Sequence, residues 1–283
     1  MSDTDTTAAA RIAEALNTRF GNPYSVSQTQ PGIAELAQIA EHRSVRRYAA
    51  KPVAPELLQL LFACAFSAPT KSDLQQADVI HVVDAGIRQR IVATIPDMKW
   101  ILDAPVFLVF CGNNRRIRHI GEWRGKPFAN EHLDHFMNAA VDAGIVMMNF
   151  IRAAEAAGLG TCPISAIRNA AAANSRELGL PEGVFPVAGL CVGYPESPGH
   201  ISPRLPLEVT VHTARYDESR LREQVDTYDR RRHHNHPYAK QRRTAQFGES
   251  EFYGWSEDKA RQYAEPERAD FGAYIRGQGF SLK

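Results

Sequence analysis

A short cationic stretch, HRSVRRY (42–48), has the clearest potential for chemistry in this sequence. Four groups that can carry positive charge surround Ser44: His42, Arg43, Arg46 and Arg47. A stretch of this kind is either a solvated charged turn or an anion-binding site, because planar guanidinium groups form paired hydrogen bonds to phosphate. The stretch alone leaves both interpretations open.

Three further segments have the composition of ligand-binding loops. Residues 67–75 (SAPTKSDLQ) form a small polar turn after an expected helix. Residues 160–169 (GTCPISAIRN) carry small side chains that let the backbone approach a ligand, directly before a helix. Residues 202–206 (SPRLP) form a stiff segment that offers Arg204. Each segment by itself is also typical of a surface turn.

Common catalytic signatures are absent from the sequence. It contains no GxGxxG after a strand, no GxxxxGK[ST], no GxSxG and no HExxH. The stretch HHNH offers His233, His234 and His236 for a metal, but no matching cysteine or carboxylate set accompanies it. We therefore expect a mobile basic surface there and no metal site.

Apolar spacing predicts the elements that must position these segments. Helices are expected at residues 7–20, 32–42, 54–68, 86–95, 132–160, 166–181 and 266–279, and strands at residues 77–83, 104–112 and 184–195. Residues 132–160 are apolar on more than one face, which is typical of a buried central helix or of a helix at a subunit interface. Alternating strands and helices indicate an α/β or α+β protein whose sheet is wrapped by helices.

The composition is that of a soluble globular protein. The 283 residues are 44% hydrophobic and 23% charged, with a net charge of +1 that gives no support for nucleic-acid binding. No apolar run reaches the roughly 18 residues of a membrane span, and the acidic start lacks the apolar core of a signal peptide. The four cysteines are widely spaced and predict reduced core residues in a cytoplasmic protein: Cys64, Cys111, Cys162 and Cys191.

In their order along the chain, these segments resemble the FMN-dependent nitroreductase family. The matching stretches include HRSVR, AAGLG, IRN, LGLPEGVFPVAGLCVGYP, PRLPLEVTVH, WSEDKAR and ERADFGAYIRGQGF. The resemblance covers roughly Ile39 onward and leaves out the first 38 residues. The tail resembles the branch of the oxygen-insensitive major NADPH nitroreductase and the NADPH–flavin reductase P.

The resemblance implies an α+β fold with a mainly antiparallel sheet flanked by helices. It implies a homodimer with the long central helix at the interface. It also divides the chain into a helical N-terminal extension (1–38), an FMN-binding core (39–215) and a C-terminal extension (216–283) that embraces the partner subunit.

The same resemblance implies a set of FMN contacts. His42, Arg43 and Ser44 would face the phosphate, with Arg204 closing the cradle. Arg46 would reach the pyrimidine edge of the flavin, where a cation stabilises the negative charge that reduction creates. Arg47 would point to the other side and be structural.

Two more segments complete the implied site. Ribityl and ring-edge hydrogen bonds would come from Thr70, Lys71, Ser72 and Gln75. The backbone beside flavin N5 would come from Pro163, Ile164, Ser165 and Ala166. The chain departs from the branch at Ser202, where a lysine is usual, at Ser165 and Ala166, where glycines are usual, and near Met98, where a glutamine is common.

The activity implied is a ping-pong transfer of hydride from NADPH through FMN to a nitroaromatic, quinone or flavin acceptor, with no protein acid or base. Recognition of the NADPH 2′-phosphate would fall to the basic tail, with five candidates: Arg230, Arg231, Arg232, Arg242 and Arg243. Three alternatives stay open: a dedicated reductase of one metabolite, a flavin-binding protein without turnover, and a basic-tailed nucleic-acid binder. Near-neutral charge disfavours the last.

Overall fold

The computed structural model describes residues 7–283 as two compact units. Unit 1 combines the described residues through His42 with His200–Glu267, and unit 2 combines Arg43–Gly199 with Arg268–Lys283. Unit 1 therefore combines the N-terminal helices with most of the C-terminal tail. The division expected from the sequence assigns residues 1–38 and 216–283 to separate parts. Among the described helices, none combines the length and hydropathy needed to cross a bilayer.

Unit 2 contains a four-stranded sheet in which every neighbouring pair is antiparallel. Its strands, in spatial order, are β1 (Ala77–His81), β2 (Val106–Asn113), β4 (Val184–Gly193) and β3 (Gly160–Ile164). The register places Val106 opposite Val192 and Pro163 opposite Leu190. This sheet confirms the α+β class.

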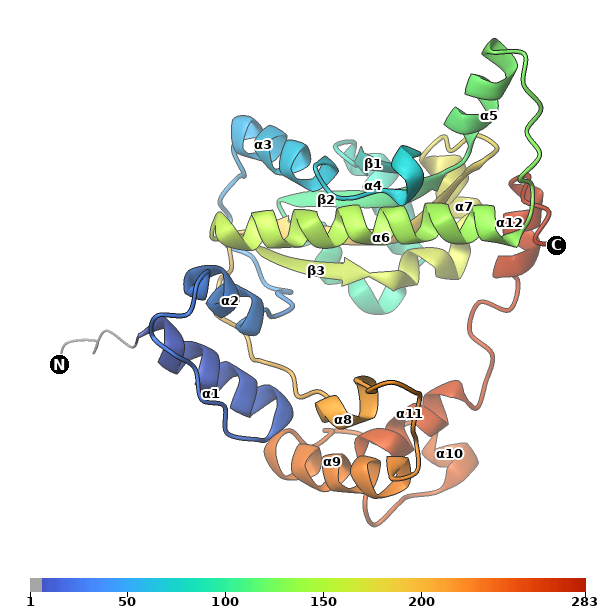
Figure 1. Cartoon of the computed structure of the whole chain (residues 1–283). Helices are drawn as coiled ribbons and strands as arrows, with labels where there is room; N and C mark the ends of the chain where they lie inside the picture. The colour runs from blue at the N-terminus through green and yellow to red at the C-terminus, as the bar shows by residue number, and fades with distance from the viewer. Residues whose placement is uncertain (1–6) are drawn as a thin grey trace. The chain divides into compact units, whose positions relative to one another are not determined.

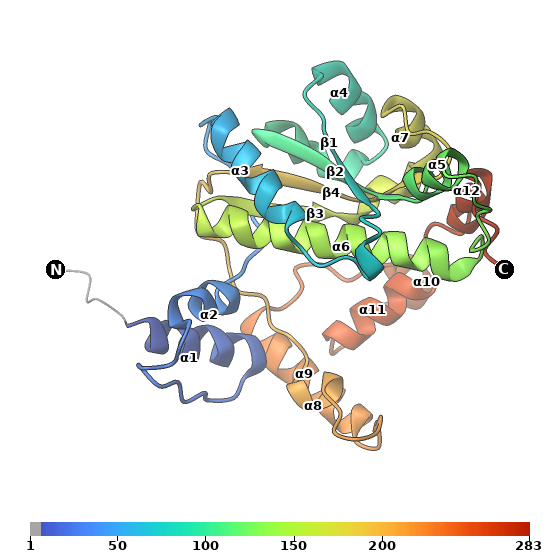
Figure 2. The same cartoon turned by 45° about the horizontal axis from the view of Figure 1, so that its top comes forward.

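Helices cover both faces of this sheet (Figures 1 and 2). One face packs on α3 (Pro55–Phe66) and the long α6 (Leu133–Ala156) around buried Phe110, Phe150 and Leu190. The other face packs Phe107 and Val109 against α4 (Ala85–Ala93) and η2 (Pro96–Asp103). The remaining elements of unit 2 are η1 (Lys71–Asp73), α5 (Arg115–Trp123), η3 (Ser165–Ala170), α7 (Ala171–Glu177) and α12 (Phe271–Gly277).

Unit 1 is helical in its described part. Its helices are α1 (Ala8–Phe20), α2 (Ile33–Ala40), α8 (Leu207–Thr210), α9 (Leu221–Asn235), α10 (Thr244–Phe247) and α11 (Trp255–Tyr263). The Thr7 hydroxyl caps α1 by accepting from the amide of Ala10 (3.3 Å), and Gly21 ends the helix at φ 82°. Ile12 and Ala15 of α1 pack on Ala37 and Ala40 of α2.

Four local expectations need correction. Residues 160–164 form strand β3, which was not expected, and the helix expected at 166–181 is divided into η3 and α7. The basic, His-rich stretch is not an irregular surface run, because residues through Asn235 belong to α9. Cys64 is exposed, whereas Cys111, Cys162 and Cys191 are buried as expected.

Candidate active site

The cationic stretch of unit 2 is extended and lies along the outer side of β3. Ser44 bridges Thr161 in parallel, and the amide of Val45 donates to the Thr161 carbonyl (2.8 Å). Val45 is buried against Gly160, where an added Cβ would lie only 2.6 Å from Val45 Cγ2. Burial of Val45 leaves the flanking Ser44 and Arg46 exposed, as expected from the period of two in an extended chain.

The arginines of this stretch have different partners. The Arg46 guanidinium hydrogen-bonds the Cys162 thiol; burial raises the pKa of that thiol, and Arg46 partly opposes the rise. Arg47 pairs with Glu196 (3.6 Å) at an exposed position. Arg43 Nη1 donates to the Pro198 carbonyl (3.2 Å). Arg46 is thus the cation held beside the exposed edge of the sheet.

A buried arginine organises the predicted phosphate segments that belong to unit 1. Arg19, only 8% exposed, donates through Nη2 to the carbonyls of Ala40 (3.0 Å) and His42 (2.8 Å), and through Nη1 to the Ser202 carbonyl (3.2 Å). The Arg204 amide donates to the Arg19 carbonyl (2.7 Å). The structure therefore brings the backbones of His42, Ser202 and Arg204 together around Arg19, a residue that the sequence reasoning missed.

The loop at residues 67–75 is held by a second residue that the sequence reasoning missed. Asp142, on α6, is 1% exposed. Its carboxylate accepts from the Thr70 hydroxyl (2.8 Å) and from the amides of Lys71 (3.1 Å) and Gln76 (3.2 Å). A lone carboxylate inside the apolar run NAAVDAGIVMM was the available signal, because a buried carboxylate needs several hydrogen bonds. We name this arrangement the Asp142 anchor.

The anchored loop has an unusual backbone. The backbone has left-handed φ values at Ser72 (50°), Asp73 (58°) and Gln75 (50°). Residues other than glycine rarely adopt this conformation. The Gln75 amide donates to Thr70 Oγ1 (2.8 Å), and Lys71 Nζ donates to Ser72 Oγ (3.1 Å). Because Asp142 and Gln75 engage the Thr70 hydroxyl, Thr70 orients the loop, and Lys71 and Ser72 lie on its exposed side.

The predicted flavin-facing segment follows the outer strand β3. Pro163 and Ser165 are exposed, whereas Ile164 and Ala166 are buried in the core. Proline is tolerated in an edge strand, where its missing N–H faces away from the sheet. Pro163 and Ser165 therefore continue the exposed edge that carries Ser44.

The five candidate arginines of the basic tail differ in their contacts and in their exposure. Arg231 Nη2 donates to the Arg204 carbonyl (2.8 Å), Arg232 lies over the Tyr238 ring at 4.5 Å, and Arg243 pairs with Glu265. Arg242 Nε donates to Asp258 (2.9 Å) and its side chain is 50% exposed. Arg230 is exposed, and it donates to Thr227 Oγ1 (3.1 Å) within α9.

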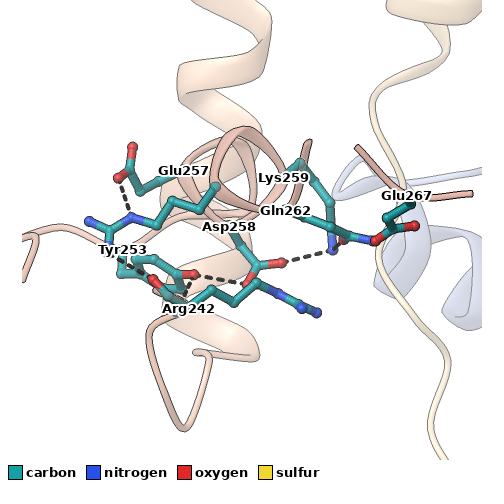
Figure 3. A network of polar contacts seen from close by, with 8 residues as sticks. Arg242, Tyr253, Glu257, Asp258, Lys259, Gln262 and Glu267 are labelled. Carbon is teal, nitrogen blue, oxygen red and sulfur yellow. Dashed lines mark hydrogen bonds and ion pairs between the residues drawn. The ribbon is translucent and has the colours of Figure 1, made fainter. Parts of the chain in front are cut away.

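Arg242 belongs to a polar network around the buried carboxylate of Asp258 (Figure 3). Asp258 also accepts from the Tyr253 hydroxyl (2.9 Å) and Lys259 Nζ (2.8 Å). Burial opposes ionisation of Asp258, but these hydrogen bonds and the charges of Lys259 and Arg242 hold its pKa below the ordinary value. We name this arrangement the Asp258 network.

The described residues contain no group of three or more His, Cys, Asp or Glu side chains that could hold a metal ion. His233, His234 and His236 therefore form no such cluster within residues 7–283. What the site offers instead is an exposed backbone edge, a cation beside it and a polar loop that is hydrogen-bonded to Asp142. These features suit the positioning of a flat, anionic cofactor.

Comparison with known proteins places both parts of the chain. The model of the Nitroreductase family matches residues 39–194, and the model of the Nitroreductase family, C-terminal domain, matches residues 202–283. An FMN reductase [NAD(P)H] of Bacillus subtilis is 36% identical over 197 residues, which cover 69% of this chain and 79% of that protein. An NADPH-flavin oxidoreductase of Vibrio harveyi is 33% identical, with coverage of 69% and 79%.

Solved structures give the same grouping over more of the chain. NfrA2 of B. megaterium superposes with a TM-score of 0.80 at 30% identity, covering 88% of this chain and 98% of that one. The NADPH:FMN oxidoreductase from Vibrio harveyi, complexed with NAD+, superposes with a TM-score of 0.76 at 28% identity, covering 88% and 99%.

Proposed function

Because this chain belongs to the nitroreductase family, we propose that it is an FMN-dependent NAD(P)H oxidoreductase that reduces nitroaromatic, quinone or flavin acceptors. Relatives that are named FMN reductase and NADPH-flavin oxidoreductase support this assignment. An oxygen-insensitive NADPH nitroreductase of Salmonella typhimurium, 33% identical over 62% of this chain, supports the nitroaromatic acceptor. Bound FMN supplies the hydride chemistry, which explains the absence of a catalytic acid–base motif.

The observation that carries this proposal is the exposed edge of unit 2. Arg46 and Ser44 lie exposed beside β3, and Pro163 and Ser165 continue that edge. A guanidinium there would stabilise negative charge at the pyrimidine side of the flavin, and the Ser165 backbone would lie beside N5. The Asp142 anchor would present Lys71 and Ser72 to the cofactor. His42, Arg43, Ser202, Arg204, Thr70, Gln75, Ile164 and Ala166 remain proposed FMN contacts.

We also propose a homodimer built on α6. Leu133, Met137, Val141 and Met148 follow one stripe of this helix and are 51%, 56%, 43% and 45% exposed. An added Cβ at Gly144, on the same helix, would meet nothing within 4 Å. An apolar stripe of this length marks a protein interface, and the double change Met137→Glu with Val141→Glu should convert the dimer to a monomer in light scattering. A cytoplasmic location agrees with the four free cysteines.

The decisive test starts with the cofactor. Purified protein incubated with FMN should retain a yellow, stoichiometric flavin, and NADPH should bleach it under anaerobic conditions. Addition of a nitroaromatic, a quinone or free flavin should then restore the colour, and NADH run in parallel gives the coenzyme preference. A protein that stays colourless in excess FMN contradicts the proposal. Stable FMN without bleaching by either coenzyme identifies a flavin-binding protein without turnover.

A further inference from the structure

Unit 2 contains a large groove that the proposed reaction does not use. Its volume is about 870 Å³, within the range of small-molecule sites. Residues 49–53, the first half of α3, the end of β1 and residues 102–106 form its walls, and we name it the α3 groove. None of the residues predicted to bind FMN is among those that line it.

One wall of the α3 groove is apolar. Leu58 is buried at its base, and Pro52, Val53 and Phe62 lie beside it. At the rim, Val83 is 77% exposed and Leu102 is 42% exposed. Exposed apolar side chains next to a concave surface mark a place where a ligand removes hydrocarbon from water.

Two cations, Arg88 and Lys51, also line the groove. Arg88 donates through Nη2 to the carbonyls of Ile101 and Ala104, but its buried Nε has no hydrogen-bond partner and it forms no ion pair with any described residue. Burial lowers the pKa of Arg88, and the nearby Cys191 and Asp103 partly offset this lowering. Lys51 adds a second cation, 4.0 Å above the Tyr194 ring.

The other titratable groups of the groove do not cancel this charge. Burial, and secondarily Arg88, lowers the pKa of His81, so its ring is neutral at pH 7. The single carboxylate that lines the groove, Asp103, is solvent-exposed. A half-buried guanidinium that forms no direct ion pair is costly, and an anionic ligand would relieve that cost by a charge-assisted hydrogen bond.

We propose that the α3 groove binds a small amphipathic monoanion, an aromatic or aliphatic carboxylate whose apolar body lies against Leu58 and Phe62 and whose carboxylate faces Arg88 and Lys51. The site is separate from the predicted flavin edge and does not depend on the proposed reductase activity. Recognition combines burial of the apolar body with attraction to two cations of the lining.

Titration calorimetry of the FMN-loaded protein with 2-naphthoate tests the proposal. One molecule should bind per chain, and the neutral analogue 2-naphthamide should bind about tenfold more weakly or worse, since it lacks the charge-assisted contact. A saturating concentration of NADP+ should leave the naphthoate affinity unchanged. Absence of saturable binding, equal binding of the amide, or competition with NADP+ overturns the proposal.

Two variants locate the binding. Lys51→Gln removes one cation, and Gln59→Trp fills the groove from an exposed position on α3. Each should weaken naphthoate binding about tenfold, whereas Lys126→Gln, at an exposed lysine outside the groove, should not. Unchanged flavin content and thermal midpoint establish that the variants are folded. Wild-type affinity in both groove variants would place the ligand elsewhere and refute the assignment.

Discussion

Asp142 in unit 2 and Asp258 in unit 1 are each 1% exposed, and each collects three hydrogen bonds from donors of different kinds. The Asp142 anchor uses one hydroxyl and two backbone amides, all neutral. The Asp258 network uses one hydroxyl and two cations, Arg242 and Lys259.

Neutral and cationic donors give the two buried carboxylates different structural roles. Amide donors fix the backbone, so the Asp142 anchor determines the path of a loop and leaves Lys71 exposed on it. Cationic donors fix side chains, so the Asp258 network engages charge that a ligand could otherwise use. In these two cases the donors decide whether the buried carboxylate fixes a loop backbone or holds cationic side chains.

The largest effect is expected from Asp142→Ala. Three donors lose their acceptor, and the free energy of unfolding should fall by roughly 3 kcal/mol in urea titrations. The left-handed residues of the loop should relax, and FMN affinity should fall about tenfold or more. Asp134→Ala is the matched control, because Asp134 is exposed on the same helix and accepts from Asn138 Nδ2 (2.9 Å). If the two variants lose the same free energy of unfolding, Asp142 does not anchor the loop.

Asp258→Asn should have the next largest effect, a loss of about 2 kcal/mol in the free energy of unfolding. The cost stays below that of a fully buried ion pair because Arg242 is half exposed. Asp226→Asn, which removes an exposed pair with Arg222 (3.1 Å), should cost only a few tenths of a kcal/mol. If Asp258→Asn is as stable as Asp226→Asn, the contacts of Arg242 and Lys259 with Asp258 do not contribute to stability.

The Asp258 network also predicts a dependence on pH. The pKa of Asp258 is lower in the folded protein than its ordinary value of 3.8. The unfolded chain therefore binds the proton more tightly, and stability is fully present above that value and is lost as pH falls towards the folded pKa. Urea midpoints measured from neutral pH to below pH 3.8 should decline more steeply in the wild type than in Asp258→Asn. Parallel curves would exclude Asp258 as the source.

Arg46 extends the comparison to a cation whose partner is a thiol, Cys162, instead of a buried carboxylate. Arg46→Ala should slow flavin reduction by NADPH about tenfold with little loss of FMN. Arg43→Ala and Arg204→Ala should instead loosen FMN by a similar factor. Stopped-flow reduction and FMN titration separate the two readouts. Equal losses of FMN affinity in all three variants would mean that these roles are divided wrongly.

The smallest effect is expected at Arg230, because an exposed guanidinium is screened by salt. If it recognises the 2′-phosphate, Arg230→Gln should raise the KM for NADPH several-fold at low salt, less at high salt, and leave the KM for NADH unchanged. Arg242→Gln, held by Asp258, should mainly lower stability. A larger coenzyme effect at Arg242 would show that the network releases its cation to the ligand.

Much of the fold could be predicted, because the spacing of apolar residues indicates which face of a helix or strand is buried. β2, expected at residues 104–112, spans Val106–Asn113, and α6, expected at residues 132–160, spans Leu133–Ala156. β3 was missed, because Gly160 and Pro163 interrupt its short pattern. α9 was missed because it has almost no apolar face, and only Tyr228 and Asp229 are buried within it.

The candidate site divides in the same way. The candidate residues Ser44 and Arg46 could be named from the local stretch HRSVRRY, and both are exposed beside buried Val45. The residues that position the site could not be found by local patterns. Asp142 lies 72 residues from Thr70, and Arg19 lies 183 residues from Ser202, so only the folded chain brings these partners together.

The order in which the chain enters its two units has a consequence for synthesis. The core of unit 2 includes Ile275 and Phe280, which pack on Phe185 and Ala139 after the chain has passed through His200–Glu267. Domains generally fold as units while the chain emerges from the ribosome. Here the sheet-bearing unit reaches its complete core only after the tail of unit 1 has been made. A ribosome that stops within that tail therefore leaves Phe185 without its contact with Phe280 (ring centroids 5.3 Å apart), and we expect nascent chains of that length to be bound by chaperones or degraded.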